Sequence, residues 1–220
     1  MDQELKNNIL KSSTSIVGIV CKDGIVLAGD RKATAGTLVL RKDEPKVAYI
    51  NDYLLIACTG ISADIELLRK VVRAELKLKE LKTKQRPTVK EGANLIGMLS
   101  FRNIRQFTTI PSIVGSLVAG YNEDGSFELY TIEPAGSVKK VEDYDANFSS
   151  GMPFILGLLE RQYSKDLTVK QAVNLAIDAI KASSQRDVGS GFGVDVYTIT
   201  KEGIKQVIKQ EVESVYKDQN

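Results

Sequence analysis

The sequence predicts an α+β protein of four layers, an αββα sandwich in which two antiparallel sheets are flanked by helix pairs. Its hydrophobic patterns follow the order strands, two helices, strands, two helices, strands, without the regular strand–helix alternation of a parallel sheet. The first strand patterns are apolar at nearly every position, which is typical of strands buried on both faces. No linker or internal repeat divides the chain, so we expect a single domain.

The first strands form two pairs. Residues 15–21 and 25–30 are β-branched runs on either side of Asp23-Gly24, a strong hairpin signal. A second pair, residues 46–50 and 53–58, surrounds Asn51-Asp52. Both pairs therefore predict antiparallel neighbours.

The period of the pattern then changes from strand to helix. Apolar residues recur at helical spacing with charges between them, which predicts a helix over residues 62–82. A second helix is expected from Thr88 to about residue 107. The apolar positions that carry these two predictions are Ile61, Ile65, Leu68, Val72 and Leu76 in the first, and Val89, Ala93, Ile96 and Leu99 in the second.

The second half repeats this order. Strands are expected at residues 113–121, 127–132 and 137–141, and a helix after Met152-Pro153. A further helix begins at Leu167-Thr168 and carries a stripe of six apolar residues, Val169, Ala172, Val173, Ala176, Ile177 and Ile180. The last hairpin joins residues 194–200 and 204–209.

The composition is that of an ordinary globular protein, with 43% hydrophobic and 26% charged residues among 220. Thirty Lys and Arg face 28 Asp and Glu, and the net charge of +2 leaves no basic excess for a phosphate backbone. No apolar run approaches the ~20 residues of a membrane helix. We therefore expect neither nucleic acid nor a membrane as a partner.

Two residue types restrict the chemistry. Cys21 and Cys58 stand far apart in apolar surroundings, which predicts reduced core cysteines in a cytoplasmic protein and neither a disulfide nor a metal site. The chain contains no His, which excludes a Ser-His-Asp triad, a Cys-His pair and a His-based zinc site. A catalytic base is therefore a lysine, a carboxylate or an amine, and no cofactor is indicated.

Thr14 lies where a nucleophile could work without histidine. Residues 1–13 are polar and lack the apolar core of a secretory signal, so they are either a frayed terminus or a pro-segment. Cutting before Thr14 would give it a free α-amine, whose pKa of about 8 lets it accept a proton from its own hydroxyl. Lys46 and Asp30, at strand ends, are candidates for a supporting ion pair. A threonine before a strand is commonplace, so this pattern alone leaves ordinary structural roles open.

Five blocks of sequence, in order along the chain, give it a family resemblance. TSIVGIVCKDGIVLAGDRKATAG (residues 14–36) is similar to the start of a mature archaeal-type proteasome β subunit, an N-terminal nucleophile hydrolase. Lys46, CTG (58–60), SSGMPFILGLLERQYS (149–164) and QRDVGSG (185–191) follow in the family's order and spacing. The resemblance extends from residue 14 to about residue 209 and implies the N-terminal nucleophile hydrolase fold over residues 14–220.

The resemblance implies a set of site residues. Thr14 resembles the nucleophile of a threonine-type endopeptidase, Asp30 and Lys46 its charge-relay pair, and the Gly60 N–H the oxyanion donor. Ser150, Asp187 and Ser190 resemble the network around the free amine. Ala33, Cys58 and Ser62 would line the pocket for the residue before the cut, which predicts a preference for large apolar residues. Glu44 and Glu66, near the rim, leave a preference for basic residues open.

The resemblance also implies activation and partners. Residues 1–13 would be a pro-segment removed autocatalytically at Ser13-Thr14. The implied assembly is four stacked heptameric rings, α7β7β7α7, formed with α subunits and other β subunits, fed with unfolded proteins by a regulatory unfoldase ATPase in the cytoplasm.

Two departures from the family pattern leave a non-catalytic alternative open. The family usually has Gly where this chain has Ser13, and a second serine where it has Met152. An unprocessed, non-catalytic structural β-type ring subunit is therefore the main alternative. The bacterial two-ring relative, disfavoured by the QRDVGSG block, and a binding module unrelated to proteolysis are the others.

Overall fold

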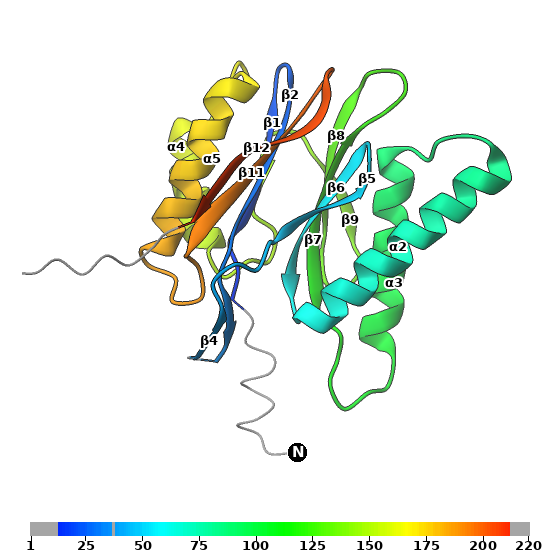
Figure 1. Cartoon of the computed structure of the whole chain (residues 1–220), viewed down its shortest axis with the longest axis horizontal. Coiled ribbons are helices and arrows are strands. Elements are labelled where there is room, and N and C mark those ends of the chain that lie inside the picture. The colour runs from blue at the N-terminus through cyan, green and yellow to red at the C-terminus, as the bar shows by residue number, and fades with distance from the viewer. Residues whose placement is uncertain (1–12, 37, 212–220) are drawn as a thin grey trace, which may run out of the picture.

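The structure, a computed structural model, describes residues 13–36 and 38–211 of the chain. Two five-stranded antiparallel sheets face each other (Figure 1). The first has the order β10-β1-β2-β11-β12, with bounds Tyr144–Asp145, Ile16–Cys21, Gly24–Asp30, Gly193–Thr200 and Gly203–Glu211. The second has the order β5-β6-β7-β8-β9, with bounds Val47–Asn51, Leu54–Gly60, Val114–Tyr121, Phe127–Ile132 and Val138–Val141.

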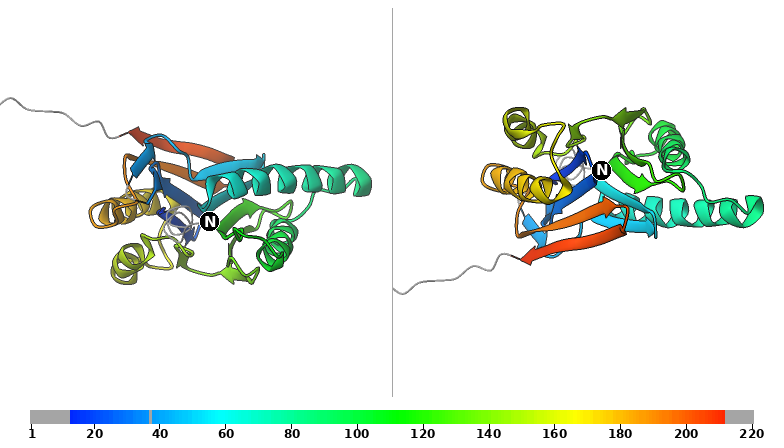
Figure 2. Two further views of the ribbon diagram at one scale, coloured as in Figure 1. Left: turned by 90° about the horizontal axis from the view of Figure 1, so that it is seen from below. Right: turned by 90° about the horizontal axis from the view of Figure 1, so that it is seen from above.

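Helix pairs cover the outer faces of both sheets, which confirms the predicted αββα sandwich. Helices α4 (Met152–Gln162) and α5 (Val169–Ser184) lie on the first sheet, and α2 (Ser62–Thr83) and α3 (Val89–Arg105) on the second (Figures 1 and 2). Helices α3 and α5 begin at Thr88 and Thr168, whose side chains form capping boxes with the residue three positions on. Within the described ranges, no helix is long and apolar enough to cross a membrane.

The alternation of side chains along β1 explains the doubly apolar strand patterns. Ile16 belongs to the core between the two sheets, whereas Val17 and Ile19 belong to the core under α4 and α5. In β2, Leu27 faces the other sheet and Val26 faces the helices. Because successive side chains in a strand point to opposite faces, strands in the middle of a four-layer protein have no solvent-facing side.

Short elements are the features that the sequence patterns missed. Strands β3 (Ala33–Ala35) and β4 (Leu38–Arg41) form a separate two-stranded sheet beside the first sheet, and β10 adds two residues to the edge of β1. All of β4 is exposed, including Leu38 and Leu40. An apolar strand that is not buried gives no alternating pattern, and the other two strands are too short to show a period.

Candidate active site

Thr14 lies directly before β1, and the register of the first hairpin places it beside the end of β2. Ile16 pairs with Gly29. One step further out, Ser15 N donates to Asp30 Oδ1 (3.0 Å) and Asp30 N donates to the Ser15 carbonyl oxygen (3.0 Å). Thr14 is only 1% exposed. The hairpin therefore holds the Thr14 backbone rigidly against the carboxylate that the sequence singled out.

Asp30 is a buried carboxylate with three backbone donors. In addition to Ser15 N, the amides of Lys32 (3.1 Å) and Gly191 (3.0 Å) donate to its Oδ2. Burial raises the pKa of Asp30 from 3.8 to about 6, although Lys46 and the three N–H groups act in the opposite direction. Asp30 therefore stays ionised at neutral pH and loses its charge in mildly acidic solution.

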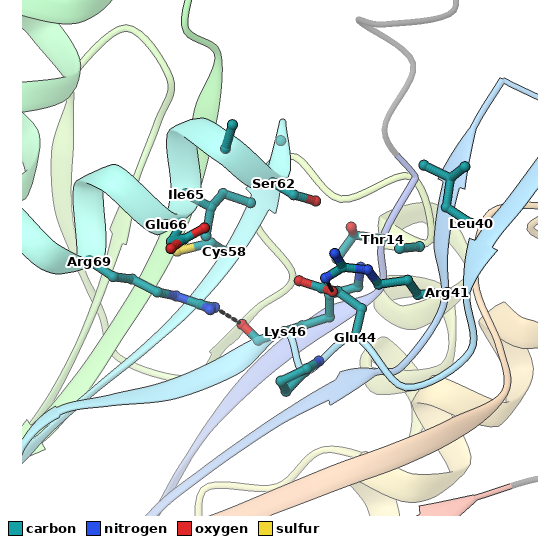
Figure 3. A pocket seen from close by; sticks show the side chains of 14 residues that line it. Thr14, Leu40, Arg41, Glu44, Lys46, Cys58, Ser62, Ile65, Glu66 and Arg69 are labelled. Atoms are coloured by element: carbon teal, nitrogen blue, oxygen red, sulfur yellow. Dashed lines mark hydrogen bonds and ion pairs between the residues drawn. The ribbon is translucent and has the colours of Figure 1, made fainter.

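Lys46 approaches from the second sheet, just before β5, and is 7% exposed. Its stem crosses over Gly29, where an added Cβ would lie 2.8 Å from Lys46 Cβ. Burial lowers the pKa of Lys46, against the attraction of Asp30 and Glu44. Its carbonyl oxygen accepts hydrogen bonds from Cys58 N (3.1 Å) and Arg69 Nη2 (2.7 Å), which fix the backbone at this point (Figure 3).

Serine hydroxyls and the Asp187 carboxylate form a hydrogen-bonded network that reaches the Thr14 nitrogen. Thr14 N donates to Ser150 Oγ at 2.9 Å, and Ser150 Oγ donates to Asp187 Oδ2 at 2.6 Å. Ser190 Oγ donates to the same Asp187 oxygen at 2.5 Å and lies 2.6 Å from Ser15 Oγ. Asp187 thus connects two serines to the backbone nitrogen that a cut before Thr14 would expose.

A cavity of about 460 Å³ opens beside Thr14 (Figure 3). Its walls come from the β3–β4 hairpin, the start of β5, the end of β6 and the first turns of α2. The lining includes every pocket residue expected from the sequence, namely Ala33, Cys58 and Ser62, together with Gly60, Lys46, Glu44 and Glu66. Burial raises the pKa of Cys58, so its thiol stays protonated and is a poor rival to Thr14 as the nucleophile.

Gly60 sits where only glycine fits. Its φ is +134°, and a side chain there would collide with the Ile113 carbonyl oxygen. Gly60 ends β6 and pairs with Val114 while also lining the cavity. The absence of a side chain therefore lets the backbone of residues 113 and 114 pack closely against the end of β6, which fixes Gly60 at the cavity wall.

Both rim carboxylates already have cationic partners. Glu44 accepts from Arg41 Nη1 at 2.9 Å, and Glu66 accepts from Lys70 Nζ at 2.6 Å. Arg69 also lines the cavity. The cavity therefore offers no carboxylate without a cationic neighbour among its described residues.

The structure thus gathers most of the expected residues into two neighbouring groups that share Thr14, whereas Asp30 belongs to neither and is held by Ser15 N. Among the described residues Asp30 and Lys46 form no direct ion pair, although the charge of Lys46 acts to lower the pKa of Asp30. The cavity group contains Lys46, Gly60, Ala33, Cys58 and Ser62, and the hydrogen-bonded group contains Ser150, Asp187 and Ser190. Of the expected pro-segment, residues 1–12 lie outside the described residues. None of the described Cys, Asp and Glu side chains gather as a group of three able to hold a metal ion.

Sequence reasoning missed four polar residues of this site. Ser15 contacts both Ser183 and Ser190 through its hydroxyl. Arg69 holds the Lys46 carbonyl, and Arg41 holds Glu44. A single serine at a strand end, or an arginine on a charged helix face, carries no signal in a sequence that distinguishes it from an ordinary surface residue.

Comparisons with known proteins show which proteins the chain is similar to. A family described as "Proteasome subunit" matches residues 10–199. "Proteasome subunit beta" of Nanoarchaeum equitans is 40% identical over 194 residues, 88% of this chain and 96% of that protein. "Proteasome subunit beta 1" of Thermococcus onnurineus is 38% identical over 204 residues, 93% of this chain and 97% of that protein. "Proteasome subunit beta" of Methanopyrus kandleri is 35% identical over 207 residues, 94% and 96% of the two chains.

Proposed function

The chain belongs to the proteasome subunit family as a β-type subunit, and we propose that it is a threonine endopeptidase whose nucleophile is Thr14. One observation carries the proposal. In a chain with no His, a buried threonine shares a cavity with a buried lysine of lowered pKa, and its nitrogen is held by a serine–aspartate network. This arrangement supports a nucleophile whose base is its own α-amine.

The proposed reaction begins once the amine is free. The Thr14 amine accepts the hydroxyl proton, directly or through water, and Thr14 Oγ attacks the scissile carbonyl. The nearby Lys46 ammonium stabilises the developing alkoxide, and Asp30 offsets the cost of burying that ammonium. The Gly60 N–H stabilises the tetrahedral oxyanion by roughly 3 kcal/mol if ordinary oxyanion-hole magnitudes apply. The tetrahedral intermediate then collapses, the scissile C–N bond breaks, and the leaving nitrogen takes the proton held by the Thr14 amine. Water hydrolyses the resulting ester and restores the hydroxyl.

Activation is proposed to remove residues 1–13. Thr14 Oγ attacks the Ser13 carbonyl carbon, the Ser13–Thr14 peptide bond breaks, and the nitrogen takes a proton to become an amine. Water hydrolyses the resulting ester between Ser13 and Thr14 Oγ, which leaves a Ser13 carboxylate on the leader. The mature chain then begins at Thr14 as one N-terminal nucleophile hydrolase domain, residues 14–220.

We propose cleavage after large apolar residues. Ala33, Cys58 and Ile65 offer small and apolar surface, and a basic side chain would have to compete with Arg41 for Glu44 and with Lys70 for Glu66. A panel of peptides that differ only in the residue before the cut tests this preference. Faster turnover after Arg than after Leu would reject it.

The proposed setting is a closed chamber of stacked heptameric rings, α7β7β7α7, in the cytoplasm. Membership of the proteasome subunit family implies assembly with other subunits. Confinement of the site, with a regulatory ATPase threading unfolded chains inward, would protect folded proteins from Thr14.

Intact-mass measurement of the subunit, co-expressed with its α-type partner, tests the peptidase. We expect the mass of residues 14–220 in the assembled particle, and Thr14→Ala to retain residues 1–13 and lose peptide hydrolysis. Particles that assemble with the full-length wild-type chain and hydrolyse no peptide would instead indicate the structural, unprocessed subunit. Ser13, in place of the usual Gly, is the feature that favours this second candidate.

A further inference from the structure

Ser13, the residue before the proposed cut, packs against Gly189. A methyl group on Gly189 would lie far inside van der Waals contact with Ser13 Cβ and Oγ, and 3.0 Å from Ser13 Cα. These are the three nearest atoms, and all belong to Ser13. The φ of Gly189 is outside the left-handed region that favours glycine. The need for glycine at this position is therefore one of space, and Ser13 alone accounts for the closest contacts.

The turn that carries Gly189 is poorly able to move away from Ser13. Gly189 N donates to Asp187 Oδ1 at 3.2 Å, and Asp187 Oδ2 accepts from Ser150 and Ser190. Lys32 Nζ donates to the Val188 carbonyl oxygen next to Gly189. A shift of this turn would disturb the same network that holds the Thr14 nitrogen.

We propose that Gly189 is a positioning residue for leader removal, because its missing side chain accommodates the side chain of Ser13. This inference rests on the proposed function and deepens it. In the cut itself, the bond from Thr14 Oγ to the Ser13 carbonyl carbon forms while the Ser13–Thr14 peptide bond breaks. That carbonyl keeps its place beside Thr14 only if Ser13 can pack on the 187–190 turn. Ser13, which replaces the glycine usual in the family, thus packs against a glycine, Gly189, on the neighbouring turn.

The pairing separates activation from later turnover. Ser13 is part of the chain only before the cut. A side chain at position 189 would therefore collide with Ser13 in the precursor and would have no such contact in the mature chain. Because a misplacement of about 1 Å at a reacting centre costs roughly a hundredfold in rate, even a partial shift of Ser13 slows the cut measurably.

The test follows leader removal by time-resolved intact mass in the full chain, co-expressed with its α-type partner. The variants are Gly189→Ala, Ser13→Gly, the double variant that combines them, and Gly157→Ala. Gly157, in α4, has no atom within 4 Å of an added Cβ and serves as the matched glycine control. We expect Gly189→Ala to slow the cut at least tenfold, the double variant to recover to within about threefold of Ser13→Gly, and Gly157→Ala to match the wild type.

The possible outcomes distinguish a failure of this inference from a failure of the proposed function. Processing of Gly189→Ala at the wild-type rate, or a double variant as slow as Gly189→Ala, overturns the role of Gly189 and leaves the peptidase intact. If Gly189→Ala fails to assemble, rescue of assembly by Ser13→Gly supports the steric pairing, and lack of rescue overturns it. A wild-type chain and a Ser13→Gly chain that both keep the leader overturn the proposed function and this inference with it.

Discussion

Replacing Gly29 by alanine tests whether the position of Lys46, in addition to its charge, sets the rate. Gly29 lies in β2 next to Asp30, on the face that meets the second sheet. An alanine Cβ would lie 2.8 Å from Lys46 Cβ and 3.5 Å from Lys46 Cγ, but at an ordinary 3.4 Å from Ile16 Cγ2. The added methyl group therefore collides with one side chain only, the lysine.

The size of the effect follows from these distances. Ordinary contacts begin at 3.4 Å, so Lys46 Cβ must retreat by about 0.6 Å, the difference between 3.4 and 2.8 Å. Rotation of the side chain leaves Cβ in place, so the Lys46 backbone itself has to shift, against the hydrogen bonds from Cys58 N and Arg69 that hold it. If about 1 Å costs roughly a hundredfold, this shift lowers kcat about tenfold. Overpacking of this kind also costs about 1–3 kcal/mol of folding stability.

The assay is steady-state hydrolysis of a peptide with a large apolar residue before the cut. Rates are normalised to the amount of chain that begins at Thr14, measured by intact mass, so that slow processing is not mistaken for slow turnover. Gly157→Ala is the control, because it adds the same methyl group at an open helix position. We expect kcat to fall about tenfold with KM within twofold of the wild type.

Two results would contradict a positioning role for Gly29. One is an assembled Gly29→Ala particle whose kcat stays within twofold of the wild type. The other is a loss carried entirely by KM, since that would place the damage in substrate binding and not at the lysine.

Three further perturbations have defined outcomes. Because Asp30 has a raised pKa of about 6 and is needed ionised, activity is present above that pH and falls as Asp30 gains its proton; kcat/KM of the processed enzyme should lose at least about nine-tenths by pH 5, since protonation of the Thr14 amine adds to the loss, and a flat profile from pH 7 to 5 would exclude Asp30. Ser150→Ala removes the acceptor of Thr14 N and its link to Asp187; we expect kcat to fall by roughly ten- to a hundredfold at unchanged KM, whereas an unchanged kcat would place the amine's support elsewhere. Asp195→Ala removes the partner of the buried Arg31 guanidinium at 2.8 Å and leaves only Glu211 at 3.5 Å; denaturant unfolding should show a loss of about 3–5 kcal/mol, and a loss below 1 kcal/mol would mean that Glu211 or water compensates Arg31.

The larger elements were predictable because their residues repeat a period. The stripe on α5 and the capping residue Thr168 predicted both the face and the start of that helix, and the Asp23-Gly24 turn predicted the first hairpin. The β3–β4 hairpin gave no such signal, since its apolar residues Leu38 and Leu40 are exposed. Burial produces a hydrophobic period, so an exposed strand escapes detection.

The residues of the site likewise differ in how far local sequence patterns predict them. The proximity of Thr14 and Asp30 follows from a two-strand register that the sequence nearly dictates. Lys46 comes from the other sheet, so its place depends on how two layers pack, which no local pattern encodes. Its strand-end position made it a candidate, and the resemblance to a known family singled it out. Arg69, which holds the Lys46 carbonyl from α2, lies among charged helix residues and gave no indication of its role.

Burial between the sheets accounts for the chemistry of the lysine–aspartate pair. It raises the pKa of Asp30 to about 6 and lowers that of Lys46 from 10.5, so one cause brings the two proton affinities closer together. A proton moves more easily between groups whose pKa values are closer, and in the proposed mature chain the Thr14 amine would be a further acceptor. On a solvated surface the same residues would keep ordinary pKa values that lie far apart. Under the proposed function, the four-layer architecture would therefore supply the pKa tuning that a histidine provides in other hydrolases, and the missing side chain of Gly29 leaves space for Lys46 between the sheets.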